Sequence, residues 1–120
     1  MADKPKVYAE AEIAGKLAEQ KLSKWKLEEG WLRRKFNTDG WRSTLMLVNA
    51  IGFLAEAADH HPDLTVTWAK VWVKLQTHSA GGITDKDFAL ARKIEESVLW
   101  RPQQGEALQG AAANEFVKVE

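Results

Sequence analysis

The stretch EAADHHPDLTVTWAKVWVKLQTH, residues 56–78, decides the fold. Its first residues end a helical pattern, and Pro62 favours a helix end because the residue before a proline disfavours helical geometry. Beyond the proline, apolar and polar residues alternate over Leu64–Trp68 and again over Val71–Gln76, which is typical of two β-strands joined tightly. The stretch therefore predicts a helix followed by a β-hairpin.

Similar patterns extend to both sides of this stretch. Apolar residues at helical spacing predict helices over residues 9–22, from Trp41 to about Asp59, and from about Asp85 to Leu99. Between the first two helices, residues 24–36 alternate around Glu29-Gly30, which predicts a second β-hairpin. The order of elements is therefore helix, two strands, helix, two strands, helix.

The ends and faces of the helices can also be predicted. Thr38 or Asp39 could cap the long middle helix, and Thr84 with Asp87 resembles a capping box before the last helix. The spacing predicts one buried face of the middle helix, and its further apolar residues suggest a second face that contacts another helix or subunit. The predicted face consists of Trp41, Leu45, Val48, Gly52, Ala55 and Ala58.

Paired strands alternating with helices predict an α+β fold. We expect a four-stranded antiparallel sheet with three helices packed on one face, in the order α-β-β-α-β-β-α. Residues 1–100 form the predicted single domain, and residues 101–120, rich in Pro, Gly, Gln and Ala, form a C-terminal extension. Residues 115–119 could dock as a short strand or remain loose.

Composition excludes several classes of protein. The 120 residues carry 17 basic and 17 acidic side chains and no cysteine, which fits one domain without disulfides or thiolate chemistry. We expect no direct nucleic-acid partner, because the one small basic cluster, WLRRKF at residues 31–36, fits a solvated strand edge. No apolar run has signal-peptide or membrane-spanning length, so we expect a cytoplasmic protein without a membrane partner.

The three histidines are the candidate catalytic residues. His60 and His61 end the middle helix, and His78 ends the last strand. Histidine can give or take a proton near neutral pH, and Glu56, one helical turn before His60, could orient its ring. If the helix end and the strand end converge, an acid/base site forms at the rim of the sheet.

The same residues also fit other roles. A histidine at a helix C-terminus often only interacts with the helix dipole, and Asp87 alone fits a helix start. Glu56 and the three histidines are also competent metal ligands. The chain has no HExxH motif, and adjacent histidines rarely both point at one ion, so we expect neither a metal nor a cofactor.

The combined spacing resembles a known family. Glu56, His60-His61-Pro62, Trp68, His78 and Asp87 follow one another as in the signature of the pterin-4a-carbinolamine dehydratases. GITDKDFALA, residues 82–91, is similar to the family's Gly-Leu-Thr/Ser-x-x-Asp segment. The resemblance covers about residues 22–99.

The resemblance implies a reaction and roles for individual residues. Family members remove water from 4a-hydroxytetrahydropterins such as 4a-hydroxytetrahydrobiopterin and give quinonoid dihydropterin, which recycles tetrahydropterin. By resemblance, His60 and His78 carry the acid/base work, and His61 binds and orients the pterin. The pocket would be lined by Asp59, Gln76, Thr77 and Ser79, with Trp25 as an aromatic wall and with Glu56 and Asp87 supporting the histidines.

The resemblance also leaves a second function open. Relatives act as a dimerisation cofactor for a homeodomain transcription factor, and similar proteins are linked to Rubisco assembly, so a non-catalytic interaction or assembly role is the alternative. We expect a homo-oligomer, because unpaired sheet edges and surplus apolar helix surface favour association. The expected forms are a dimer through sheet edges or a tetramer through helices.

Overall fold

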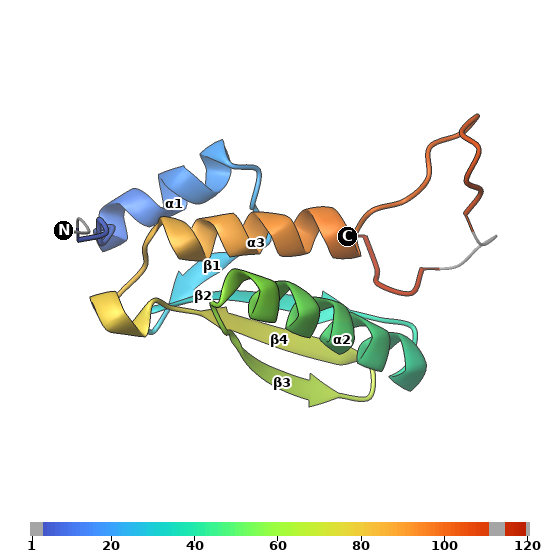
Figure 1. Ribbon diagram of the computed structural model, residues 1–120, viewed down its shortest axis with the longest axis horizontal. Coiled ribbons are helices and arrows are strands. Elements are labelled where there is room, and N and C mark those ends of the chain that lie inside the picture. The colour runs from blue at the N-terminus through green and yellow to red at the C-terminus, as the bar shows by residue number, and fades with distance from the viewer. Residues whose placement is uncertain (1–3, 111–114, 120) are drawn as a thin grey trace.

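The computed structural model describes residues 4–110 and 115–119, and it has the predicted order of elements (Figure 1). The described helices and strands are α1 (Glu10–Glu19), β1 (Lys26–Glu28), β2 (Trp31–Asn37), α2 (Trp41–Ala58), β3 (Asp63–Thr67), β4 (Lys70–Leu75), the 3₁₀ helix η1 (His78–Ala80) and α3 (Asp85–Val98).

The four strands form one antiparallel sheet in the order β1-β2-β4-β3. Glu29 and Gly30 join β1 to β2 with φ angles of 52° and 83°, as a two-residue turn with two left-handed positions requires. Trp68 and Ala69 join β3 to β4. Both predicted hairpins are confirmed, and β1 and β3 are the edge strands.

One core lies between the sheet and all three helices. Alternation turns Leu32 and Phe36 of β2, and Val71, Val73 and Leu75 of β4, toward the helices, where they have no exposed surface. They join a single buried cluster with residues of every helix, including Ile13, Leu17, Leu47, Ile51, Phe88, Ala91 and Ile94. The prediction of three helices on one face of the sheet is therefore confirmed.

The predicted buried face of α2 is correct at Ala55 and in part at Val48, and wrong at its other positions. Trp41 and Leu45 are 48% and 41% exposed, whereas the buried residues are Ser43, Thr44, Leu47, Ile51 and Ala55. The helix is apolar almost all round, so spacing alone selects no single stripe. The buried stripe contains two polar residues, Ser43 and Thr44, and the hydroxyls of both have hydrogen-bond partners.

The predicted cap of α2 is also wrong. Gly40 occupies the N-cap position without a side-chain cap, and its φ of 151° favours glycine. The Thr38 side chain is instead buried and bonds the Thr44 hydroxyl at 2.7 Å, while Asp39 accepts a hydrogen bond from Ser43. An added Cβ on Gly40 would lie 3.4 Å from the indole of Trp68, so the turn leaves little room for a side chain.

The C-terminal segment, residues 115–119, returns to the domain beside the end of α3 (Figure 1). Val117 is buried and forms an isolated antiparallel bridge with Thr38. The Lys118 amide donates to the Asn37 carbonyl at 2.8 Å, and the Arg101 guanidinium donates to the Val117 carbonyl at 2.6 Å. Of the two alternatives for residues 115–119, the described residues show docking.

Within the described ranges, no helix has the length and apolar character that crossing a membrane requires.

Candidate functional site

A chain reversal at the end of α2 places the paired histidines. Asp59 adopts the left-handed conformation, with a φ of 49°, and ends the helix. The His60 amide then donates to the Ala55 carbonyl at 3.1 Å, one of the bonds that close such helix ends. The helix therefore ends before the two histidines, and helical spacing from Glu56 no longer predicts where their rings lie.

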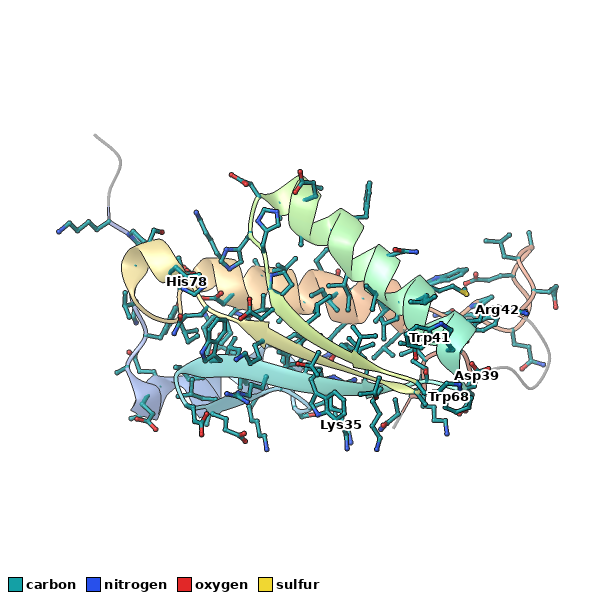
Figure 2. All side chains as sticks on the ribbon, turned by 90° about the horizontal axis from the view of Figure 1, so that it is seen from below. Lys35, Asp39, Trp41, Arg42, Trp68 and His78 are labelled. Atoms are coloured by element: carbon teal, nitrogen blue, oxygen red, sulfur yellow. The ribbon has the colours of Figure 1, made fainter. Side chains whose placement is uncertain are left out.

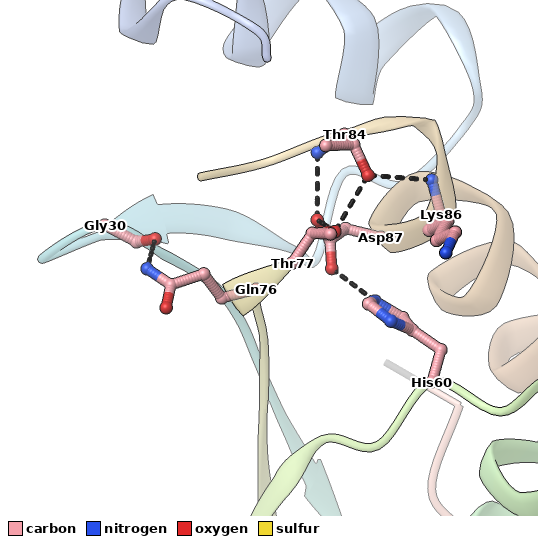
Figure 3. A network of polar contacts seen from close by, with 7 residues as sticks. All are labelled: Gly30, His60, Gln76, Thr77, Thr84, Lys86 and Asp87. Carbon is pink, nitrogen blue, oxygen red and sulfur yellow. Dashed lines mark hydrogen bonds and ion pairs between the residues drawn. The ribbon is translucent and has the colours of Figure 1, made fainter. Parts of the chain in front are cut away.

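His60 is paired with a fully buried carboxylate. Its Nε2 lies 2.7 Å from Oδ1 of Asp87, whose side chain has no exposed surface, while the His60 side chain is 11% exposed. Asp87 lies in the first turn of α3, so this contact joins the end of α2 to the start of α3 (Figure 3).

The second carboxylate oxygen of Asp87 is also satisfied. Oδ2 accepts from the Thr77 hydroxyl at 2.7 Å and from the Thr84 amide at 2.9 Å. The Thr84 hydroxyl accepts from the Lys86 amide at 3.2 Å and lies 2.8 Å from the Thr77 hydroxyl. This is the predicted capping box of α3, confirmed, and it also holds the residue that precedes His78 (Figure 3).

The hydroxyls of this network have a defined direction. The Thr77 hydroxyl donates to Oδ2 of Asp87, so the Thr84 hydroxyl donates to Thr77. The contact of Nε2 with Oδ1 suits the tautomer of His60 that carries its proton on Nε2, since a carboxylate oxygen accepts. Nδ1 of His60 has no hydrogen-bond partner among the described residues.

A hollow of about 570 Å³ opens beside His60, between α2 and α3. Its size suits a small molecule, and its wall is mainly apolar with two lysines. It is lined by Leu54, Ala57, Ala58, His60, Lys86, Ala89, Leu90 and Lys93.

His61 is exposed and contacts a different carboxylate. Its Nε2 lies 2.8 Å from Oε1 of Glu56, and the two side chains are 57% and 82% exposed. The prediction that Glu56 orients His60 is therefore corrected, since the reversal at Asp59 gives Glu56 to His61 and Asp87 to His60.

The prediction that His78 ends the last strand is corrected, because β4 ends at Leu75 and His78 begins η1 directly after the buried Thr77. The His78 side chain is exposed. Its ring meets the Trp31 ring edge to face, with centroids 5.3 Å apart. Lys74 Nζ lies 4.5 Å from the centre of the same indole. The three imidazoles share no hydrogen bond within the described part of the chain, and His60 is linked to the backbone of His78 through Asp87 and Thr77.

The family model described as "Pterin 4 alpha carbinolamine dehydratase" matches residues 6–97, more than half of the chain. The protein belongs to this pterin dehydratase family.

Relatives and a solved structure agree with the family match. A protein of Aquifex aeolicus (strain VF5), named "Putative pterin-4-alpha-carbinolamine dehydratase", is 48% identical over 79 residues, covering 66% of this chain and 80% of its own. A protein of the same name from Haloarcula marismortui is 39% identical over 94 residues, covering 78% and 95%. A structure titled "transcriptional coactivator/pterin dehydratase from Brucella Melitensis" matches with a TM-score of 0.67 and 27% identity, covering 75% of this chain and 96% of that one.

Trp25 does not form the aromatic wall that the sequence predicted for this protein. Trp25 is 3% exposed in the core, and its Nε1 donates to Glu95 at 2.7 Å. The indole beside His78 belongs to Trp31, which sequence reasoning missed. Strand parity could have found it, because a two-residue turn at Glu29-Gly30 leaves Trp31 on the face opposite Leu32.

The other residues that were predicted to line the pocket of this protein occupy both buried and exposed positions. Thr77 is buried, Gln76 is half-buried and donates to the Gly30 carbonyl at 3.0 Å, and Ser79 and Asp59 are exposed. Among the described residues, no group of three or more His, Cys, Asp or Glu side chains could hold a metal ion.

Proposed function

We propose that this protein removes water from a 4a-hydroxytetrahydropterin, such as 4a-hydroxytetrahydrobiopterin, and gives quinonoid dihydropterin for tetrahydropterin recycling. The observation that carries the proposal is the contact of His60 with Asp87, together with the bond from Thr77 to the same buried carboxylate. One network thereby holds the ring of His60 and Thr77, the residue before His78.

The reaction needs one acid and one base. A protonated imidazole gives its proton to the 4a-hydroxyl, the C4a–O bond breaks, and water leaves as the N5 lone pair forms the C=N bond. A second imidazole then takes the proton from N5, which leaves a neutral quinonoid product. Two groups that titrate near neutral pH are enough for this chemistry, and we infer that no metal or redox cofactor takes part.

His60 and His78 are our candidates for these two groups. Asp87 orients His60 through Nε2 and leaves Nδ1 to face the ligand, as the carboxylate of a catalytic triad orients its histidine. His61, held by Glu56, would bind and position the pterin. Asp59, Gln76, Thr77 and Ser79 would line the pocket, and we propose Trp31 in place of Trp25 as its aromatic neighbour.

The test is the rate of quinonoid dihydropterin formation from a freshly generated 4a-hydroxytetrahydropterin. Acid/base groups contribute about 10²- to 10⁴-fold each, so His60→Ala and His78→Ala should each lower kcat by at least about 100-fold. Arg92→Ala, an exposed position on α3, is the matched control and should keep full activity. A double histidine variant that still accelerates the reaction would refute the proposal.

A non-catalytic interaction or assembly role is the second candidate. The observation that favours it is the exposed apolar surface on α2, where Trp41, Leu45, Met46 and Phe53 are 48%, 41%, 50% and 72% exposed. Such surface often marks a protein interface. Turnover by the isolated protein would favour the enzyme, whereas inactive protein that co-purifies with a fixed partner would favour the second role.

The same surface supports self-association. We propose a dimer through the β1 or β3 edge or a tetramer through α2, inside the cytoplasm. Light scattering at micromolar concentration should give a mass of two or four chains, and Phe53→Glu should lower the mass if α2 is the interface. A monomer of the wild-type chain would exclude this part of the proposal.

A further inference from the structure

The face of the sheet that the helices leave uncovered gathers basic side chains. Register places alternate residues of all four strands on this face, which we call the open face. Its basic members are Lys26, Arg33, Lys35, Lys70 and Lys74, and its acidic members are Glu28 and Asp63. Figure 2 shows Lys35 on the opposite side of the sheet from α2.

This distribution differs from that of the whole chain. The sequence has 17 basic and 17 acidic residues, but strand alternation places five basic and only two acidic residues on the open face. Lys26 and Arg33 pair with Glu28, at 2.9 and 3.7 Å. Among the described residues, Lys35, Lys70 and Lys74 form no ion pair, so they can meet an anionic partner without breaking one.

Two indoles lie among these cations. Trp72, on β4, is 36% exposed and stands opposite Lys35 of β2 in the register. Trp31 lies one position beyond the Leu32–Leu75 pair, with Lys74 over its ring. Four residues of strand register separate the two indoles, a distance of about 13 Å at 3.3 Å per residue.

A hollow of about 380 Å³ lies on the open face beside Trp72. It combines an aromatic wall, two cations and two hydroxyls that can donate or accept hydrogen bonds. It is lined by Arg33, Thr65, Thr67, Trp72, Val73 and Lys74.

We propose that the open face binds single-stranded nucleic acid. A base stacks on Trp72 in the hollow, where the hydroxyls of Thr65 and Thr67 reach its edge. Lys35 and Lys74 contact the phosphates on either side, and a further base reaches Trp31 after Lys74 moves from its ring. Stacking platforms combined with cations that follow the backbone are the common means of binding single strands without reading sequence.

The geometry favours a single strand over a duplex. A duplex keeps its base faces stacked inside, so the indoles have no base to stack on, and three unpaired lysines alone give weak attraction to its phosphates at physiological salt. A single strand offers both phosphates and free base faces. The separation of about 13 Å corresponds to about four nucleotides at the 3.4 Å rise of a stacked strand, within the usual site sizes of about 4 to 16 nucleotides.

Fluorescence anisotropy with a labelled oligothymidine of about 12 nucleotides at low salt tests the proposal on the full chain. Trp72→Ala should weaken binding about fivefold or more, while Trp72→Phe, which keeps an aromatic face, should bind nearly as the wild type does. Trp41→Ala, which removes an exposed indole from α2, is the matched control and should have no effect.

The charge contribution is measured separately with Lys35→Gln combined with Lys74→Gln. Removing two phosphate contacts should reduce the slope of log K against log salt by about 1.4, at about 0.7 per phosphate for single strands. Lys86→Gln combined with Lys93→Gln on α3 should leave the slope unchanged. These variants decide the question even if Trp72→Ala does not fold.

Three results would overturn the proposal. They are no saturable binding of the oligonucleotide at low salt, equal affinity for a duplex of the same length, and a salt slope that the open-face lysines do not change. The dehydration reaction does not enter this assay, so its outcome is independent of the proposed catalytic function.

Discussion

At the scale of single residues, Asp87 serves two structural purposes at once. Its Oδ2 caps α3 and accepts from Thr77, and its Oδ1 contacts His60. A buried carboxylate with partners on both oxygens is costly to disturb, because removal of one partner leaves a desolvated charge unsatisfied.

Thr77→Val tests this residue-scale interpretation. The change keeps the shape of the side chain but removes the hydroxyl that donates to Asp87 and accepts from Thr84. We expect the free energy of unfolding to fall by about 1 to 3 kcal/mol in urea denaturation. We also expect a lower kcat in the dehydration assay, since Asp87 no longer holds His60 firmly.

Thr65→Val, at an exposed strand position, is the matched control and should change stability by less than about 0.5 kcal/mol. If the two valine variants prove equally stable, the Thr77 hydroxyl contributes nothing to the network.

The residue types of the site were predictable from the sequence, and their pairing was not. Spacing and resemblance selected the histidines and both carboxylates. Which carboxylate meets which imidazole depends on one backbone angle at Asp59, and no spacing rule reports that angle. The exchange of Trp25 for Trp31 has a different cause, since Trp25 lies just before β1, where strand alternation does not predict which way a side chain points, whereas parity does place Trp31 opposite Leu32.

At the scale of elements, the end of α2 carries strain that can be tested. Asp59 is left-handed, a conformation that costs most non-glycine residues about 1 to 2 kcal/mol and that aspartate tolerates better than most. Asp59→Gly should therefore leave the free energy of unfolding unchanged or raise it by up to about 1 kcal/mol, and the melting temperature should be equal or higher. If Asp59 also lines the pterin pocket, KM should rise in the same variant while the fold stays intact.

Asp59→Val provides the opposite control, because a β-branched residue tolerates this conformation poorly and should destabilise the protein. A stable valine variant would mean that the chain reversal does not need a left-handed residue.

The first turn of α3 is held from outside by the segment before α1. The Tyr8 hydroxyl donates to Asp85 at 2.6 Å, and its ring meets Phe88 edge to face at 5.1 Å. The hydrogen bond to Asp85, followed by partial burial, raises the pKa of Tyr8 above its usual value. A raised pKa means that the folded state holds this proton more tightly than the unfolded state does.

The stability that Tyr8 contributes should therefore be present below the ordinary tyrosine pKa of about 10 and should be lost as pH rises through the higher folded value. We expect Tyr8→Phe to be less stable than the wild type at pH 7 and the difference to shrink in alkaline solution. Denaturation at a series of pH values measures this, and a difference that grows with pH would contradict it.

The elements themselves followed closely from local patterns. Alternation, a Glu-Gly turn and Pro62 were enough for both hairpins, because period-two patterning and turn chemistry are local properties. The face of α2 could not be predicted in this way. Its apolar residues surround the helix, and the buried stripe includes Thr44, whose hydroxyl bonds Thr38 just before the helix and the Trp68 carbonyl in the β3–β4 turn.

At the scale of the whole molecule, the C-terminal segment closes one end of the domain. Val117 is 6% exposed and lies against the start of α2 through its bridge to Thr38. The sequence left this docking open because five residues without a long pattern acquire structure only from the surface they meet. The excess of basic residues on the open face was not predicted either, because equal totals of basic and acidic residues do not report how these residues are distributed over the surface.

Val117→Asp measures the docking. Placing a charge at a buried valine removes apolar burial worth about 1.5 kcal/mol or more and adds a desolvated carboxylate, so we expect clear destabilisation in thermal melts. Val119→Asp, two residues on and exposed, is the matched control and should melt as the wild type does. Equal melting temperatures for the two would show that the segment is loose in solution.

The course of α3 separates the two ends of the chain. The N-terminal end lies near the start of α3, and the C-terminal end lies near its other end (Figure 1). Fourteen residues of helix hold them about 21 Å apart along the axis. If the proposed function holds, an affinity tag joined beyond residue 119 would lie at the end of α3 away from Asp87, whereas one joined before residue 4 would lie at the end that carries the Asp87–His60 contact and would interfere with the dehydration assay.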